Sequence, residues 1–156
     1  MAAAQRMKID TAPVLAGDWL EKAVALNPNG ADVNALLGLG LRYLGRPEEA
    51  VERLEKAIRL NPMPSSPWYV FLSSALLNAG RYDEAVTVSR KAVKLSPNNI
   101  FAHLALVLSY FLGSRDEEGR FAAAEVLRIQ PNFCVDSFAK RLPYKNPEDI
   151  LRQVNM

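Results

Sequence analysis

The chain has 156 residues, which is enough for one domain with a sizeable core. Apolar residues make up 49% of it and charged residues 23%, and the formal charge of +2 is too small to indicate nucleic-acid or acidic-membrane binding by itself. No apolar run has the length of a membrane span or of a signal peptide, and the single cysteine excludes an intrachain disulfide. We therefore expect a cytoplasmic globular protein with neither a nucleic-acid nor a membrane partner.

Residues 1–12 are expected to be flexible or ordered only by packing. The first predicted helix covers about 13–26, as the second half of a repeat whose first half is missing or disordered. Apolar residues at helical spacing then predict three pairs of antiparallel helices. The pairs are expected at 31–44 with 47–60, 66–79 with 82–95, and 100–112 with 116–129.

Three series of residues share one period along the chain. Each second helix is followed by a proline, which cannot continue a helix. The turn inside each pair carries a glycine or serine, and glycine allows the left-handed backbone that ends a helix. The third series is one small residue in each second helix. The series are Pro28, Pro62, Pro97 and Pro131; Gly45, Gly80 and Ser114; and Ala50, Ala85 and Gly119. The prolines lie 34, 35 and 34 residues apart, so the sequence predicts a repeat protein.

Within these helices the pattern separates a core face from a solvent face. In the helix at 31–44 the apolar residues Val33, Leu36, Leu37 and Leu41 are expected to face the core. Acidic residues open the second helices, as the helix dipole favours. On the exposed face of 47–60 we expect ion pairs four residues apart: Glu49 with Arg53, Glu52 with Lys56, and Glu55 with Arg59.

The segment from Trp68 to Ala85 and its continuation from Lys91 to Pro97 resemble the tetratricopeptide repeat consensus. The family's pair of a leucine and a small residue is matched at three places, and its later alanine at two. These are Leu37-Gly38, Leu72-Ser73 and Leu106-Val107, with Ala57 and Ala92. Gly119 and Val126 replace the usual alanines in the last repeat, so that helix should be the least well packed.

The resemblance covers 13–131 and implies an all-α superhelical solenoid. Its expected parts are a half repeat at 13–30, repeats at 31–65, 66–99 and 100–132, and a capping helix with a tail over 133–156. Within the tail, Arg141 to Pro147 is similar to segments that follow such repeats in bacterial multidomain signalling proteins, including some adenylate cyclases. A second interpretation is therefore a regulatory or oligomerising region of a larger enzyme such as a nucleotide cyclase. Whether the chain is complete stays open.

Motifs for catalysis or metal binding are weak, and we expect no catalytic residue, metal or cofactor. His103 is the only histidine, so a His-based metal site or a nucleophile–base pair has no partners. Cys134 is expected to be buried under the cap. The glycines of Gly38-Leu39-Gly40 are expected to let helices approach, because no strand precedes them as a phosphate loop requires.

In the tetratricopeptide architecture the first helix of each pair lines the concave surface. Laying that geometry on this sequence predicts a protein-binding groove that is apolar with a polar end. Its residues are Asp32, Leu39, Arg42, Tyr43, Val70, Ser74, Leu77, Asn78, Phe101, Leu104, Leu108 and Phe111. Family members that hold acidic chaperone tails use Lys, Arg and Asn in this groove. Here the matching residues are Ala35, Leu39, Phe71, Phe101 and Ala105, so that activity is not expected.

The first function hypothesis is therefore a non-catalytic scaffold that binds an apolar or amphipathic protein segment in this groove. Two alternatives stay open for the same residues. A second copy of the chain could cover the groove in a homo-oligomer, or the apolar side chains could be satisfied by packing within one protomer.

Overall fold

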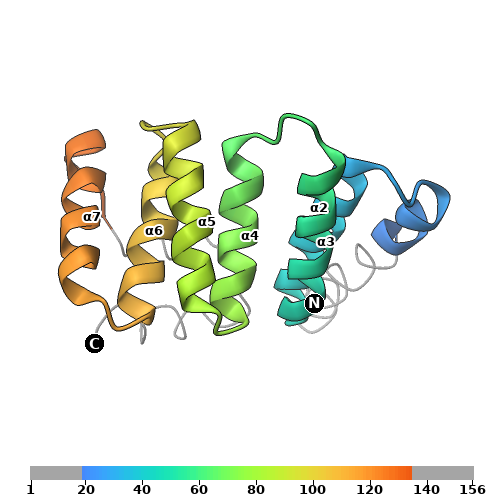
Figure 1. Ribbon diagram of the computed structural model, residues 1–156, viewed down its shortest axis with the longest axis horizontal. Coiled ribbons are helices and arrows are strands. Elements are labelled where there is room, and N and C mark those ends of the chain that lie inside the picture. The colour runs from blue at the N-terminus through green and yellow to red at the C-terminus, as the bar shows by residue number, and fades with distance from the viewer. Residues whose placement is uncertain (1–18, 135–156) are drawn as a thin grey trace, which may run out of the picture.

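The computed structural model describes residues 19–134, and these residues are helical apart from short turns and linkers (Figure 1). A helical segment over 19–26 precedes six complete helices. They are α2 (Ala31–Tyr43), α3 (Pro47–Leu60), α4 (Ser66–Asn78), α5 (Tyr82–Leu95), α6 (Ile100–Leu112) and α7 (Asp116–Ile129). The predictions for 1–12, for the cap and tail beyond Cys134, and for the Arg141–Pro147 motif lie outside the described residues. No described helix is long and apolar enough to cross a membrane.

The helices stack as three antiparallel pairs in two layers. Each first helix packs on its own second helix, α2 on α3, α4 on α5 and α6 on α7. Successive first helices also contact each other, since α4 touches both α2 and α6. All second helices run in the same direction, so the turns inside the pairs lie at the lower edge of Figure 1 and the linkers 61–65 and 96–99 lie at the upper edge.

The helices end where the sequence allows the backbone to turn. Gly45 and Gly80 have φ values of 74° and 73° and close the turns inside the first two pairs. Ser114 occupies the same place in the third pair with φ 57°, a conformation that a residue with a Cβ adopts at a cost. Pro47 lies in the first turn of α3, where its missing N–H is not needed.

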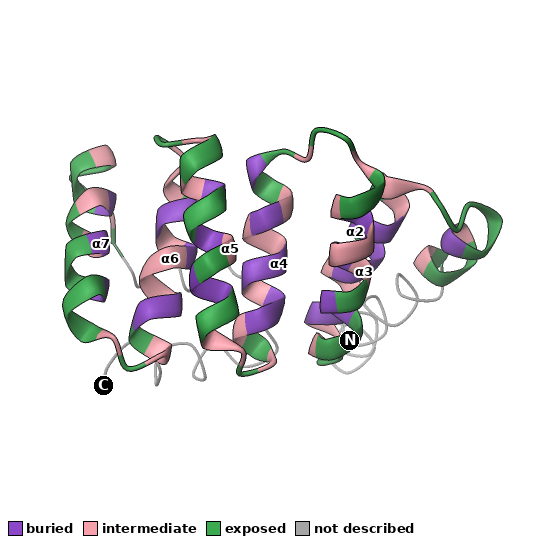
Figure 2. Ribbon diagram, viewed as in Figure 1, coloured by how far each residue is buried: buried purple, intermediate pink, exposed green. Residues whose placement is uncertain are grey.

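The core lies between the two layers (Figure 2). Leu54 and Leu76 are its largest fully buried apolar side chains, and Ala50, Ala57 and Ala85 are completely buried beside them. Gly38 of α2 lies directly against Leu54 of α3, because a Cβ at residue 38 would stand 2.6 Å from Leu54 Cγ. A small residue at this point therefore sets how closely the two helices of a pair approach.

The last pair packs differently. A Cβ added at Gly119 of α7 would lie 3.0 Å from the Phe111 ring of α6, so the ring occupies the space that alanine would need. Among the described helices α7 makes substantial contact with α6 alone, and it buries Gly119, Ala122 and Val126. Glycine in the place of the usual alanine therefore accommodates an aromatic side chain rather than leaving a void.

Candidate functional site

The first-helix face is the surface of α2, α4 and α6 that is turned away from α3, α5 and α7. Residues three or four apart on a helix share one stripe, which groups the predicted binding residues along this face. On α4 the stripe holds Val70, Ser74 and Leu77, with Asn78 exposed at the helix end. On α6 it holds Phe101, Leu104 and Leu108, and Phe111 lies at its border, because the Phe111 ring also packs on Gly119 of α7.

The apolar residues of these two stripes are incompletely buried. Phe101 is 55% exposed and Phe111 is 37% exposed. Val70, Leu77, Leu104 and Leu108 are all half-buried. None of the six is sealed inside the protomer, so packing within the described residues leaves apolar surface on α4 and α6 accessible.

The α2 end of the face carries less charge than the sequence suggested. Asp32 is exposed, and Leu39 and Tyr43 are half-buried. Arg42 is only 8% exposed, and its guanidinium lies 4.4 Å from the centre of the Tyr43 ring, a cation–π contact. The arginine charge is therefore directed to the ring and the interior. On α4, the Ser74 hydroxyl donates to the Val70 carbonyl at 2.9 Å.

Sequence reasoning missed Leu36. It was expected in the core beside Leu37, but it is 54% exposed while Leu37 is 2% exposed, so that prediction is wrong. The residues one and two periods further on are Phe71, which is half-buried, and Ala105, which is buried. The repeat alignment does not predict this exposure either, because Phe71 and Ala105 are both more buried than Leu36.

The polar groups that looked most like catalytic candidates have structural partners. His103 is 6% exposed, and its Nε2 lies 2.7 Å from the Pro97 carbonyl oxygen. Asn34 occupies the same repeat position in α2 and donates from Nδ2 to the Pro28 carbonyl at 3.0 Å. Both side chains therefore hold a linker proline in place. Glycine 40, like Gly38, allows a close approach, since its Cβ would lie 3.1 Å from Leu20.

The thiol and carboxylate groups do not converge as a metal site in the described part of the chain. Cys134 is exposed, so the expectation of a buried cysteine is wrong. Between residues 19 and 134 no group of three or more His, Cys, Asp or Glu side chains converges as metal ligands would. The acidic residues that open the second helices are engaged with arginines instead.

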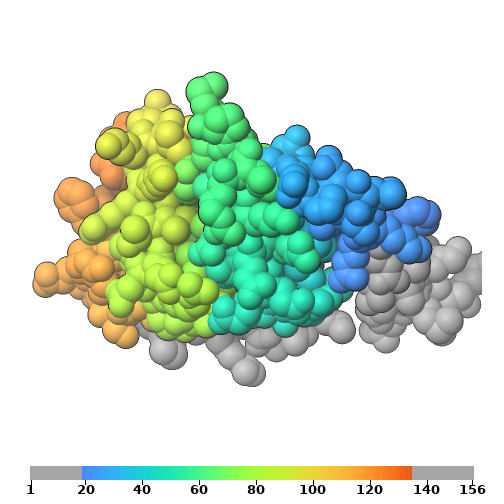
Figure 3. Space-filling view, turned by 45° about the vertical axis from the view of Figure 1, so that its right-hand side comes forward, coloured from blue at the N-terminus to red at the C-terminus, as the bar shows by residue number. Residues whose placement is uncertain are grey.

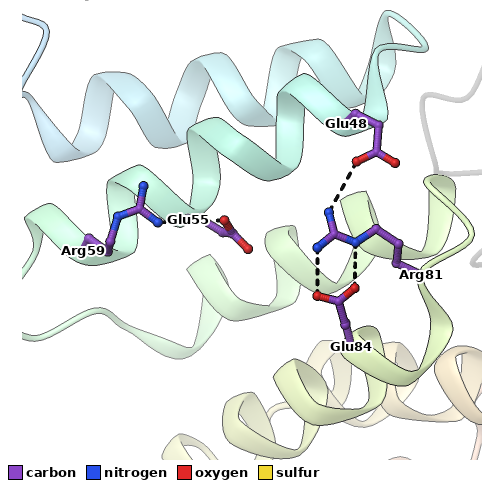
Figure 4. A network of polar contacts seen from close by, with 5 residues as sticks. All are labelled: Glu48, Glu55, Arg59, Arg81 and Glu84. Atoms are coloured by element: carbon purple, nitrogen blue, oxygen red, sulfur yellow. Dashed lines mark hydrogen bonds and ion pairs between the residues drawn. The ribbon is translucent and has the colours of Figure 1, made fainter.

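Each of these arginines precedes a second helix and binds the glutamate three residues later. Arg81 donates to both carboxylate oxygens of Glu84, at 2.7 and 2.8 Å (Figure 4). Arg46 binds Glu49 in the same way, and Arg115 binds Glu118 at 2.7 Å. Hydrogen bonding to arginine lowers the pKa of Glu49, Glu84 and Glu118, and hydrogen bonding to glutamate raises the pKa of the arginines.

Two of the arginines also connect neighbouring repeats. Arg81 reaches Glu48 of the preceding second helix at 3.3 Å, and Arg46 reaches Glu21 at 3.2 Å. Between the second and third turns a cavity of about 390 Å³ opens, lined by Gly80–Glu84 and Leu112–Ser114. This cavity is shallow and polar, at the opposite end of the helices from the linkers.

The pairing on α3 differs from the sequence prediction. Glu49 binds Arg46 rather than Arg53, and among the described residues only Glu55 with Arg59, at 3.8 Å, forms one of the three predicted pairs. Arg53 lies 3.5 Å from Asn34 Oδ1. The turn arginine therefore outcompetes the residue four positions on for the glutamate.

Stacked helix pairs of this kind define the class of α-helical repeat solenoids, in which each repeat contacts only its neighbours. Residues 35–100 match the family model of the tetratricopeptide repeat. The described helices form a solenoid of tetratricopeptide repeats, as the resemblance of the sequence predicted.

Related proteins and structures agree with this assignment. The chain is 28% identical to the TPR repeat-containing protein YpiA of Bacillus subtilis over 84% of its own length and 30% of YpiA. It is 33% identical over 118 residues to the human N-alpha-acetyltransferase 16, NatA auxiliary subunit, covering 70% of this chain and 13% of that protein. The chain thus spans less than a third of these relatives.

Solved structures share the fold. A crystal structure of MamA superposes with a TM-score of 0.70 and 23% identity, covering 83% of this chain and 73% of that one. A second MamA structure gives 0.67 at 28% identity, with 83% and 72% covered. YrrB, described as a TPR protein with an unusual peptide-binding site, gives 0.63 at 20% identity, with 82% and 63% covered.

Proposed function

We propose that this protein is a non-catalytic scaffold that binds an apolar or amphipathic segment of another protein on its first-helix face. The observation that carries the proposal is the accessible apolar surface on α6, where Phe101 is 55% and Phe111 37% exposed and Leu104 and Leu108 are half-buried beside them. Incompletely buried apolar stripes on adjacent helices are the surface on which an amphipathic helix docks.

The face is also suited to a ligand with little charge. Of its two predicted ionic residues, Arg42 is buried against Tyr43 and Asp32 alone is exposed. Ordered arginine–glutamate pairs occur at the turns, at the start of the second helices, and not on this face. Burial of apolar area would therefore supply most of the affinity, at about 25 cal/mol per Å² removed from water.

The test is selection of random peptides displayed on phage against the full chain, followed by measurement of the selected peptides by calorimetry. The peptides should be rich in apolar residues, and Leu104→Glu with Leu108→Glu should abolish their binding while the helical circular dichroism is retained. Arg120→Glu, an exposed change on α7, is the matched control and should leave binding intact. Binding that survives both leucine changes would disprove the proposal.

Self-association is measured in the same samples. If a second copy of the chain covers the face, the mass from light scattering falls on dilution, and the Leu104→Glu and Leu108→Glu variant is monomeric throughout. If the wild-type chain is monomeric at every concentration, self-association is excluded and the ligand of the face is a different protein.

A further inference from the structure

The linker edge is the edge of the solenoid formed by linkers 27–30, 61–65 and 96–99, the last two turns of the second helices and the first turn of the first helices. It runs along the top of Figure 1 at the linkers 61–65 and 96–99. More than half of the large apolar side chains that are exposed in the described chain gather here. They are Leu26 (89% exposed), Leu60 (37%), Met63 (86%), Leu95 (50%), Phe101 (55%) and Leu127 (52%).

Basic side chains lie on the same edge, in the last two turns of the second helices. They are Lys56, Arg59, Arg90, Lys91, Lys94 and Arg128. Arg59 and Arg128 have acidic partners, Glu55 at 3.8 Å and Glu125 at 2.8 Å, and Asp32 is the other acid of this edge. Lys91 lies 4.7 Å over the Tyr69 ring, and Lys94 is exposed. The edge therefore carries an excess of positive charge.

The opposite edge, formed by the turns inside the pairs, has the reverse character. It holds the acidic first turns of α3, α5 and α7, including Glu48, Asp83 and Glu117, in excess over the three turn arginines. The charge of the described chain is thus divided between two parallel edges. A divided charge orients a protein in an external field even when its net charge is small.

We propose that the linker edge docks on an anionic lipid surface, with the lysines and arginines at the phosphate level and the Met63 and Leu95 side chains between the headgroups. This surface shares Phe101 and Asp32 with the first-helix face, but its basic residues and Met63 and Leu95 lie outside that face, and it goes beyond the proposed function. Protruding apolar side chains flanked by basic ones bind anionic membranes by partial insertion and by electrostatic attraction together. The net charge of +2 does not indicate this edge, because the charges of the basic edge and the acidic edge largely cancel in the sum.

The shape of the edge favours lipid over an acidic polypeptide. The linker between α3 and α4 projects at the top of the molecule in Figure 3, as the green segment of the chain. Met63 lies on the linker 61–65 and Leu95 is the last residue of α5, so each side chain would insert independently. A fluid bilayer accepts separate insertions, whereas a peptide helix needs a continuous groove for its apolar face.

The test is sedimentation of the full chain with two kinds of vesicle, phosphatidylcholine alone and phosphatidylcholine with about a third phosphatidylserine. We expect sedimentation with the serine-containing vesicles at low salt and its loss at high salt. Met63→Ser with Leu95→Ser, and separately Lys91→Glu with Lys94→Glu, should each weaken binding by roughly tenfold or more. Met63→Ser alone, at an 86% exposed position, tests insertion without risk to the fold.

The matched controls are Phe121→Ser, which removes a 79% exposed aromatic side chain from the middle of α7, and Arg120→Glu beside it. Neither should change vesicle binding. The proposal is overturned if wild-type chain stays in the supernatant, if it binds both vesicles equally, or if the linker-edge variants bind as wild type does. Binding to soluble polyglutamate without binding to vesicles would also overturn it and would assign the edge to an acidic polypeptide.

Discussion

The Ser73 hydroxyl of α4 lies 2.6 Å from the Ser89 hydroxyl of α5, and neither side chain is exposed to solvent. Ser109 of α6 completes the cluster, 3.2 Å from Ser89 and 3.4 Å from Ser73, and donates to the Ala105 carbonyl. Three hydroxyls therefore satisfy one another at the junction of the second and third pairs. A buried polar group without such partners would cost stability.

Enlarging this cluster should destabilise the fold. Ser73→Val places an extra methyl group among three close helices and removes a hydroxyl that Ser89 contacts, so we expect a loss of about 2 kcal/mol in the free energy of unfolding. Ser73→Ala, which adds no volume, should cost about 1 kcal/mol. Urea unfolding followed by circular dichroism measures both. Equal stability of the Val variant and the wild type would show that the junction is loosely packed.

Gly38→Ala should also destabilise, although alanine has the higher helix propensity by about 1 kcal/mol. The new Cβ would stand 2.6 Å from Leu54 Cγ and 3.1 Å from the Ala50 carbonyl, so α2 and α3 must separate. We expect a net loss of about 1–3 kcal/mol in urea unfolding. Gly40→Ala is the matched control, because its Cβ meets only the end of the Leu20 side chain. A gain of stability in Gly38→Ala would contradict the close approach.

The turns predict a pair of opposite changes. Ser114→Gly should stabilise the chain by roughly 0.5–1 kcal/mol, because glycine adopts the left-handed backbone without the cost that a Cβ adds. Gly80→Ala should cost about 1 kcal/mol at φ 73°, and for backbone reasons alone, since no atom lies within 4 Å of the added Cβ. Thermal unfolding of the two variants should move the midpoint in opposite directions.

The turn ion pairs predict a decline in stability in acid. The pKa of Glu84 is lowered in the folded state by Arg81, so the stabilisation is present above the ordinary glutamate pKa of 4.5 and is lost as pH falls through the lower folded value. Glu49 and Glu118 behave in the same sense. Glu84→Gln should therefore reduce the slope of the urea midpoint against pH below 4.5 and leave the slope near pH 7 unchanged. Identical slopes would argue against the pair.

Much of the fold was predictable because its boundaries are set by residues with few conformations. Prolines and positive-φ glycines fix where helices end. The second helices therefore occur over the predicted residues, and α2 and α4 each end one residue earlier than expected. The face of each side chain was less predictable. Leu36 and Leu37 are adjacent leucines in one apolar pattern, yet one is 54% exposed and the other 2%.

The polar interior was not predictable at all. Ser73, Ser89 and Ser109 come from three helices and share no spacing, so their cluster exists only in three dimensions. The competition for Glu49 between Arg46 and Arg53 depends on the turn geometry before α3, which a helical pattern does not contain. The binding role of the first-helix face stays a prediction until the leucine variants are measured.

The repeats differ in length because their linkers differ in length. The first helices begin at Ala31, Ser66 and Ile100, so the step from α2 to α4 is 35 residues and the step from α4 to α6 is 34. The longer step contains the linker 61–65, and α4 carries Tyr69 at the repeat position where α2 has Asn34 and α6 has His103, the two residues that bind a linker carbonyl. A ligand that spans all three first helices therefore crosses two different junctions, α2 to α4 and α4 to α6. A ligand motif with strictly equal spacing should not match both junctions.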